Sequence, residues 1–156
     1  MQNSTGKKMS SQEAIKYFTP SIEDIRVGYE LEVYYKHFFS DKPTEEGWEN
    51  HIVRLETLIL YAGEVKKGVA RVPYLTKEQI EKEGWEYMSK SVDIWFKKEG
   101  SFEMYGWTAR KVVCHYGLHD KKLTIYADDT GTDHHIFQGQ CKDINTFRYI
   151  CKLLGI

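Results

Sequence analysis

The chain has 156 residues, enough for one domain with a hydrophobic core of its own. Its 22 Lys and Arg nearly cancel its 23 Asp and Glu, which disfavours a dedicated nucleic-acid binder because such proteins gain affinity by neutralising phosphates. Aromatic residues are abundant, at 11 Tyr, 7 Phe and 4 Trp, and are typical of β-strands or of contact surfaces.

The three cysteines are Cys114, Cys141 and Cys151. An odd number without C-x-x-C spacing argues against a disulfide framework and against a zinc knuckle. Free cysteines in strands and helices usually behave as small buried apolar residues, and this usage favours a reducing compartment. The N-terminal residues lack the apolar segment of a secretory signal, and no run approaches membrane-spanning length, so we expect no membrane association.

In chain order, residues 1–9 are polar and without a period, which predicts a disordered tail. A capping-box pattern then predicts a short helix over 14–18, followed by one further helical turn over 21–25. The alternating residues from Val27 to Tyr35 predict a strand with one buried face and with Glu32 directed toward water.

Charged residues, proline and glycine between His37 and Asn50 predict a loop. Alternation of apolar and polar residues from Ile52 to Tyr61 predicts a second strand. The segment 62–68 is predicted to turn the chain into a returning strand, Val69 to Tyr74. Pro73 has no N–H to donate, so it indicates an edge strand or a strand end.

The next helix has the clearest signals for its start and end. Thr76 and Gln79 form a T-x-x-Q capping box, in which each side chain accepts a backbone N–H from the other residue. Leu75 and Ile80 stand at the two positions of a hydrophobic staple around that cap. Gly84 then predicts the end of the helix.

From Lys90 onward the pattern predicts an antiparallel meander. Gly100 is interpreted as a turn. One or two further strands are expected over 102–105 and 107–116, and a second turn over 117–121.

The last segment reads as a hairpin followed by a helix. Strands are predicted over 123–127 and 135–141, joined by the polar turn 128–133. Asp143 is suited to cap the helix, and Gly155 to end it in the left-handed conformation. The apolar residues of this helix recur at helical spacing and form one stripe: Ile144, Phe147, Ile150, Cys151 and Leu154.

Together these elements predict an α+β fold. We expect a single twisted, mostly antiparallel sheet of about six or seven strands with two or three short helices, because strands that follow one another without crossovers do not form a parallel sheet. The C-terminal helix should pack on the sheet. Residues 10–156 are predicted to form a single domain.

Asp128, Asp133 and His134 are candidate ligands for a divalent metal ion. Carboxylates and imidazoles bind such ions and can activate water, so a metal-dependent hydrolase is one hypothesis. His134 and His135 are adjacent in a strand and should point to opposite faces, which keeps them from sharing one ion. The alternative interpretation is an ordinary polar hairpin tip.

A second candidate site combines cations with aromatic rings, which together hold nucleotides by charge and by stacking. Its residues are Trp95, Trp107, Tyr126, Lys97, Arg110 and Lys111. The alternative is that these lysines and arginines keep turns and edge strands soluble.

Catalytic motifs are missing from the sequence: there is no G-x-S-x-G elbow, no phosphate-binding glycine loop and no H-E-x-x-H. Cys114 and His115 are neighbours in a strand, so their side chains should point apart. We therefore predict no catalytic residue and no cofactor, and a protein that is not an enzyme is favoured.

Three segments carry a family resemblance. They are Glu23–Gly28, Tyr74–Trp85 and Ile144–Ile156, and they cover roughly a quarter of the chain at their matching positions. These segments resemble small accessory proteins of tailed phages that infect gut Bacteroides-type bacteria, crAss-like phages among them. The resemblance implies a phage protein made in the bacterial cytoplasm, in the virion or outside it, and it provides no catalytic residues to transfer.

The leading hypothesis is a non-enzymatic phage-encoded protein that binds a host or phage protein in the bacterial cytoplasm through an aromatic-rich surface. The second is an anti-defence protein that sequesters a nucleotide-type small ligand, and the third is the metal-dependent hydrolase. The sequence leaves open a homo-oligomer, and it disfavours nucleic acid as a partner.

Overall fold

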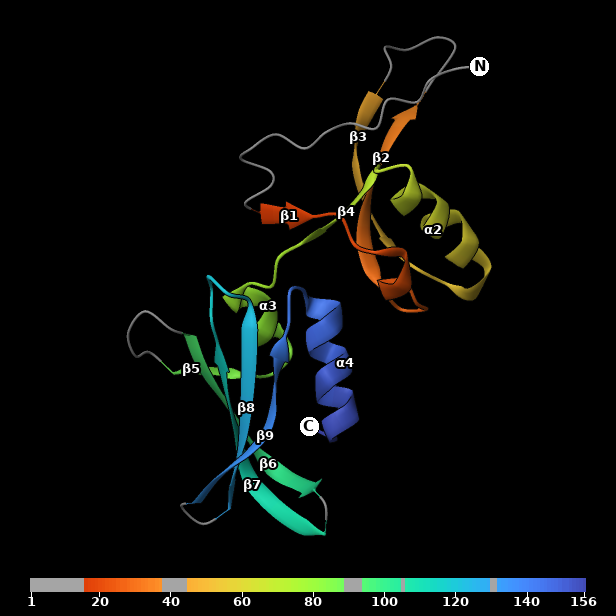
Figure 1. The fold of residues 1–156 in the computed structure, drawn as a ribbon. Helices are drawn as coiled ribbons and strands as arrows, with labels where there is room; N and C mark the ends of the chain where they lie inside the picture. Colours follow the sequence, from red (N-terminus) through yellow and green to blue (C-terminus); the bar gives the residue numbers. More distant parts are fainter. Residues whose placement is uncertain (1–15, 38–44, 89–93, 105, 130–131) are drawn as a thin grey trace. The chain divides into compact units, whose positions relative to one another are not determined.

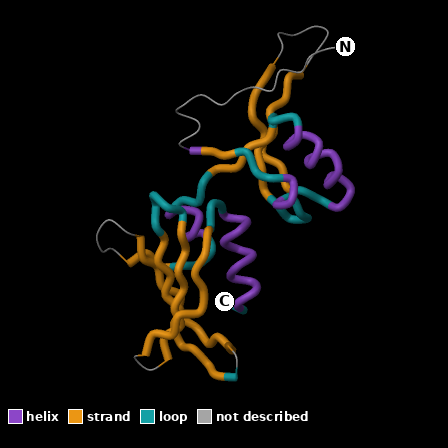
Figure 2. Tube along the Cα trace, in the orientation of Figure 1, coloured by secondary structure: helices purple, strands orange, loops and turns teal. Residues whose placement is uncertain are grey.

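The structure, a computed structural model, describes residues 16–37, 45–88, 94–104, 106–129 and 132–156. The fold is α+β, as predicted, with antiparallel sheets and a C-terminal helix (Figures 1 and 2). No helix in these ranges has both the length and the apolar character that a membrane crossing requires.

The chain divides into two compact units, residues 1–74 and 75–156, which we call the N-terminal and C-terminal units. The predicted single sheet is therefore wrong, because the described strands form two separate sheets. The prediction of one domain over residues 10–156 stays a prediction. The tail predicted for residues 1–9 lies outside the described residues.

The N-terminal unit has a four-stranded antiparallel sheet in the order β1-β4-β2-β3. Its strands are β1 (Tyr17–Phe18), β2 (Glu30–His37), β3 (Glu45–Ile52) and β4 (Ala70–Pro73). Its helices are the 3₁₀ turns η1 (Ile22–Asp24) and η2 (Leu55–Thr57) and the α-helix α2 (Leu58–Lys66). The alternation predicted for β2 is confirmed, since Tyr29, Leu31 and Val33 are buried in the core of this unit.

Several predictions for the N-terminal unit are wrong, among them the turn over 62–68, where α2 continues to Lys66. Tyr17 and Phe18 form a strand rather than the end of a helix. Residues 45–50, expected in a loop, pair with β2 along its length, because β2 supplies the partner that a local sequence pattern cannot show. The strand expected over 52–61 is η2 and the start of α2: an apolar run of this length fits either structure, and here Tyr61 and Val65 pack one helical face on the core.

Arg71 of β4 ties the N-terminal sheet together. Its Nε donates to an oxygen of Glu32 at 2.7 Å, and its guanidinium lies 3.8 Å from the ring centre of Tyr17 and 3.9 Å from that of Trp48. Glu32 is thus half-buried in an ion pair rather than directed into water as predicted. An arginine stacked between two rings joins β1, β4 and β3 through contacts that no single strand could make.

The C-terminal unit has a five-stranded antiparallel meander in the order β5-β6-β7-β8-β9. Its strands are β5 (Glu86–Met88), β6 (Ile94–Met104), β7 (Trp107–Tyr116), β8 (Lys122–Asp129) and β9 (Thr132–Gln140). Its helices are α3 (Lys77–Lys82) and α4 (Ile144–Leu154), the latter lying along one side of the meander in Figure 1. Gly100 is inside β6 at a bulge rather than in the predicted turn.

Both helices of the C-terminal unit begin and end as the sequence predicts. Thr76 Oγ1 accepts the N–H of Gln79 at 3.3 Å, and Gln79 Oε1 accepts the N–H of Thr76 at 2.9 Å. Asp143 accepts the N–H of Thr146 at 2.9 Å, and Gly155 closes α4 with a φ of 71°. The predicted stripe of α4 packs into the core of this unit, with Phe147 fully buried.

Candidate functional site

The five-stranded sheet presents two faces of different character. Phe96, Cys114 and Ile125 are fully buried in a core that also takes up residues of α3 and α4. Since side chains alternate along a strand, the residues between them project from the other side, where no described element of this unit packs. We call that side the open face. Its residues on β6, β7 and β8 include Trp95, Lys97, Glu99, Lys111, Val113, His115, Lys122, Thr124, Tyr126 and Asp128.

An aromatic row crosses the open face from β6 to β9. The ring centre of Trp95 lies 4.7 Å from that of His115 and 6.3 Å from that of Tyr126, whose ring is nearly parallel to it at 19°. Tyr126 in turn meets His135 edge to face at 5.5 Å. Trp95, His115 and Tyr126 are half-buried, and His135 is exposed. The row is therefore held by its own ring contacts while each side chain keeps part of its surface exposed.

A β-bulge brings His135 into this row. Phe137 pairs with Ile125 on the core side, but the next pair along the two strands is His135 with Tyr126, so the register shifts between them. Without the shift His135 would share the face of Phe137, because the two stand two positions apart in the strand. The bulge thus turns one imidazole from the core side to the open face.

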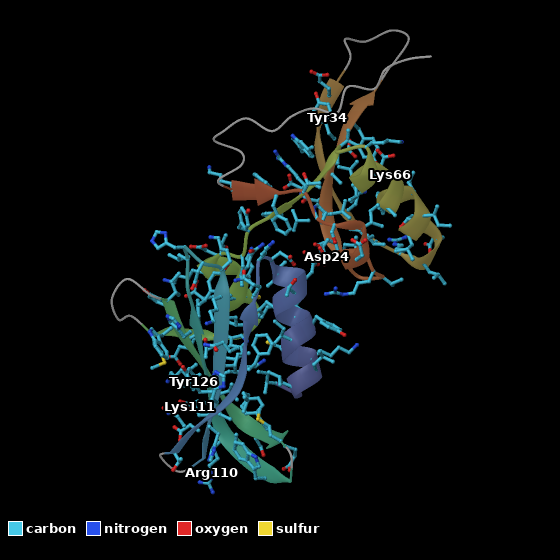
Figure 3. The ribbon with its side chains drawn as sticks, viewed as in Figure 1. Asp24, Tyr34, Lys66, Arg110, Lys111 and Tyr126 are labelled. Carbon is cyan, nitrogen blue, oxygen red and sulfur yellow. The ribbon has the colours of Figure 1, made fainter. Side chains whose placement is uncertain are left out.

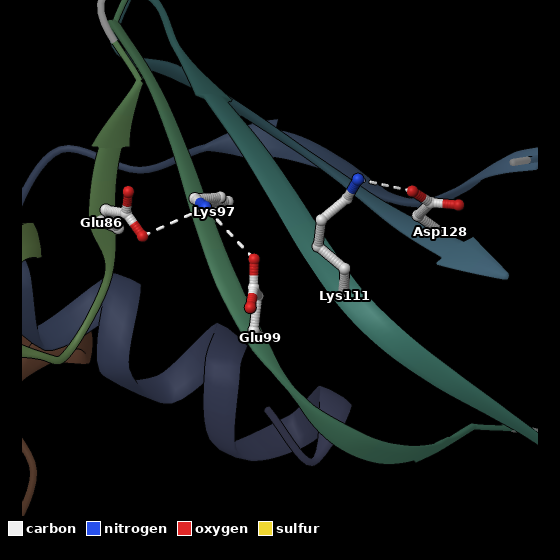
Figure 4. A network of polar contacts seen from close by, with 5 residues as sticks. All are labelled: Glu86, Lys97, Glu99, Lys111 and Asp128. Atoms are coloured by element: carbon white, nitrogen blue, oxygen red, sulfur yellow. Dashed lines mark hydrogen bonds and ion pairs between the residues drawn. The ribbon is translucent and has the colours of Figure 1, made fainter. Parts of the chain in front are cut away.

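Ion pairs flank the aromatic row (Figure 4). Lys97 Nζ lies 3.1 Å from Glu99 and 3.2 Å from Glu86 of β5, and Lys111 Nζ lies 2.6 Å from Asp128. Hydrogen bonds to Glu99 and Glu86 raise the pKa of Lys97, and the hydrogen bond to Asp128 raises the pKa of Lys111, so both lysines stay charged.

Carboxylates outnumber cations on the open face. Asp133, the register partner of Asp128, joins Glu86, Glu99 and Asp128 there. Four carboxylates therefore face three lysines, Lys97, Lys111 and Lys122. Glu86 and Glu99 have side chains 70% and 69% exposed, so they remain accessible to a partner in addition to Lys97.

The structure brings together four of the six residues predicted for the aromatic and cationic site. Trp95, Tyr126, Lys97 and Lys111 share the open face (Figure 3 labels Tyr126 and Lys111). Arg110 precedes Lys111 on β7, at the irregularity of the β6–β7 pairing, and its side chain is exposed.

Trp107 stands apart from the row, opposite Met104, with its ring centre 5.0 Å from that of His134. Sequence reasoning did not assign His115 to the aromatic site, although His115 alternates in phase with Lys111 on β7 and could have been found from that signal. It did not assign His135 to that site either, because the bulge that brings it there was not predicted.

The metal hypothesis rested on Asp128, Asp133 and His134. The carboxylate of Asp128 already forms an ion pair with Lys111. His134 is the register partner of Ala127, so it lies on the side of the sheet away from Asp128. Within the described ranges, no three side chains of His, Cys, Asp or Glu gather in a way that could hold a metal ion. The turn residues 130–131 lie outside the described residues.

The cysteines are free and buried. Burial raises the pKa of all three thiols, that of Cys151 to about 12, so each remains protonated near neutral pH. Cys114 is buried in the core, while His115 takes part in the aromatic row on the other face. Their adjacency in sequence therefore makes no nucleophile and base.

Comparison with protein-family models, with curated proteins and with solved structures gives no match for this chain. The resemblance to phage accessory proteins therefore stays a prediction from the sequence.

Proposed function

We propose that the protein is a non-enzymatic binding protein, and that the open face of its C-terminal sheet takes a basic segment of a partner protein. The observation that carries this proposal is an aromatic row set on a face where four carboxylates outnumber three lysines. Aromatic side chains supply large contact area at little entropic cost, and they are enriched at protein interfaces.

The balance of charge favours a protein over a nucleotide. A phosphate group would approach Lys97 and Lys111 only in competition with the carboxylates that already bind them. The remaining negative charge repels an anionic ligand and attracts a cationic one. The nucleotide-sequestering hypothesis is for this reason the weaker of the two.

The proposed partner residue is arginine, with lysine as the second choice. A guanidinium stacks on the exposed side of Trp95 or Tyr126 and at the same time pairs with Glu86 or Glu99 at the edge of the row. A partner encoded by the bacterial host or by the phage stays a prediction from the resemblance.

The proposal is tested by selecting displayed random peptides on the full chain and measuring the affinity of the enriched ones by calorimetry. We expect Arg-containing and Lys-containing peptides, and a loss of affinity of about tenfold or more in the double variant Trp95→Ala/Tyr126→Ala. Tyr149→Ala, which removes an exposed tyrosine of α4, is the matched control and should leave the affinity unchanged.

A selection that enriches acidic peptides would contradict the proposed charge preference. Binding of mononucleotides or cyclic dinucleotides that depends on Trp95 would favour the nucleotide hypothesis instead. Peptides that bind the double variant as tightly as the unaltered chain would place the interface elsewhere on the molecule.

A further inference from the structure

The helix α2 of the N-terminal unit carries apolar residues outside the core as well as inside it. Tyr61 and Val65 are buried in the core of this unit. Ile59 and Leu60 lie outside that core and are 88% and 53% exposed, and Leu55 of the preceding turn η2 is 76% exposed. A helix with apolar residues all round is normally covered on every side, so these three exposed residues call for a cover that the described part of the chain does not supply.

The exposed residues belong to one continuous stripe, which we call the α2 ridge. Residues three and four apart share one side of a helix, so the ridge runs through Leu55, Ile59, Gly63 and Lys66, with Glu56 beside it. Figure 3 labels Lys66, in the last turn of α2. The apolar part measures on the order of a few hundred Å², the size at which patches on soluble proteins are often functional.

Gly63 leaves a gap in the α2 ridge. A Cβ added at this position would meet no atom within 4 Å, so no contact inside the unit requires a glycine there. Glycine also weakens a helix interior relative to alanine, because it has more backbone freedom to lose. What a glycine does provide is close approach for a neighbouring side chain. Ile59, one turn earlier, is the most exposed of the large apolar residues and protrudes beside the gap.

We propose that the protein forms a symmetric dimer in which the α2 helices of two copies pack antiparallel along their ridges. In one register, Ile59 of each copy lies over Gly63 of the other, so the protruding side chain fills the gap. The same register sets Glu56 of each copy opposite Lys66 of the other, because both pairs are centred on residue 61. One arrangement thus satisfies the shape and the charge of the ridge together.

Charge is the reason that the partner is a second copy. Glu56 stands before the first residue of α2 and Lys66 is its last residue, and both are exposed. A ridge with an acid at one end and a base at the other is complementary to itself when one copy is reversed. The ridge lies in the N-terminal unit and the open face in the C-terminal unit, so the dimer does not depend on the proposed binding of a basic segment. A single helix pair forms a small interface, which places the dissociation constant in roughly the micromolar range.

Sedimentation equilibrium of the full chain at a series of concentrations tests the dimer. We expect the average mass to rise from one copy toward two, and Ile59→Glu to weaken the association by about tenfold or more. Gly63→Gln should weaken it as well by filling the gap, while its melting temperature stays the same or rises because a glycine leaves the helix interior. Leu153→Glu, which changes a 67% exposed leucine of α4, is the matched control and should associate like the unaltered chain.

A charge exchange tests the register. Glu56→Lys and Lys66→Glu should each weaken the dimer, because each variant sets like charges opposite one another. An equal mixture of the two variants should associate more tightly than either alone, since both facing pairs are then of opposite charge. Thermal melts of the variants show whether the unit is intact.

Three results would overturn the proposal. The first is a chain that stays monomeric at about 0.1 mM, well above the expected dissociation constant. The second is an Ile59→Glu variant that associates as tightly as the unaltered chain, which would place the contact elsewhere. The third is a mixture of the two charge variants that associates no better than each alone, which would exclude the antiparallel register.

Discussion

The covered and open faces of the C-terminal sheet are built from the same strands and differ in what the alternate residues meet. On the covered face, Phe96, Leu123 and Ile125 are fully buried under α3 and α4, and they stabilise the fold by removing apolar surface from water. On the open face, Trp95 and Tyr126 are held by ring contacts and by flanking ion pairs. The aromatic content of this chain therefore has two origins, core packing and a preformed surface.

The largest effect that separates the two faces should come from adjacent residues of β6. Phe96→Ala removes a fully buried ring and should lower the free energy of unfolding by about 3–5 kcal/mol. Trp95→Ala removes a larger side chain from the open face and should cost less, about 1–2 kcal/mol, since it loses ring contacts and partial burial only. Urea denaturation monitored by circular dichroism gives both values. Equal losses would mean that the open face is part of the core.

The buried thiols make the stability of the covered face depend on pH. Their folded pKa values are raised above the ordinary 9.0, that of Cys151 to about 12. Above pH 9 the unfolded chain therefore loses protons that the folded chain keeps. Stability is fully retained below that pH and falls as the pH rises from 9 toward 12, by roughly 1 kcal/mol per pH unit for each thiol.

Cys151→Ala isolates this effect from the titration of tyrosines and lysines. Its free energy of unfolding should fall less steeply with pH above 9 than that of the unaltered chain. Urea midpoints at a series of pH values measure the two slopes. Parallel slopes would show that Cys151 ionises equally in both states.

The caps of the two helices that cover the core should have smaller effects. Asp143→Ala leaves the Thr146 N–H without its acceptor and should cost about 1–2 kcal/mol, because the cap is buried. Thr76→Ala should cost about 1 kcal/mol at the exposed start of α3. Asp143→Asn and Thr76→Ser keep an acceptor oxygen and serve as controls in thermal melts. An alanine variant as stable as its control would contradict the capping role.

The ion pair of the open face should have the smallest effect on stability. Lys111 is 38% exposed, and such pairs contribute about 0–1 kcal/mol, less at high salt. A double-mutant cycle with Lys111→Ala and Asp128→Ala measures their coupling. A coupling well above about 1 kcal/mol would show that the pair is shielded from solvent by something packed on the open face.

Local signals predicted the C-terminal unit better than the N-terminal one. The helix caps at Thr76 and Asp143 depend on residues only a few positions apart, and so does the apolar stripe of α4. The structure confirms these features. In the N-terminal unit, β3 forms because β2 lies beside it, and its own residues carry glutamate and glycine that suggested a loop. The apolar residues from Ile52 to Tyr61 fit both the two-residue period of a strand and the 3.6-residue period of a helix. Packing of Tyr61 and Val65 on the core selects the helix.

The candidate site divides in the same way. Basic pairs near aromatic residues selected Trp95, Lys97 and Tyr126, and alternation along β6 and β8 explains why these three share a face. The position of His135 depends on the bulge in β9. The ion pairs of Lys97 with Glu86 and of Lys111 with Asp128 depend on carboxylates from neighbouring strands. Those partners come from register, which the sequence of one strand does not contain.

The sequence by itself determined where the two helices of the C-terminal unit start and stop and, away from the bulges, which residues of a meander strand lie on one face, because capping and side-chain period are set by near neighbours. Only the tertiary structure decided that the strands form two sheets, that one face of the second sheet has no described helix of its unit on it, and that acids surround its aromatic row. The physical reason is the range of the interactions: hydrogen bonds between strands and packing between layers join residues far apart in the chain.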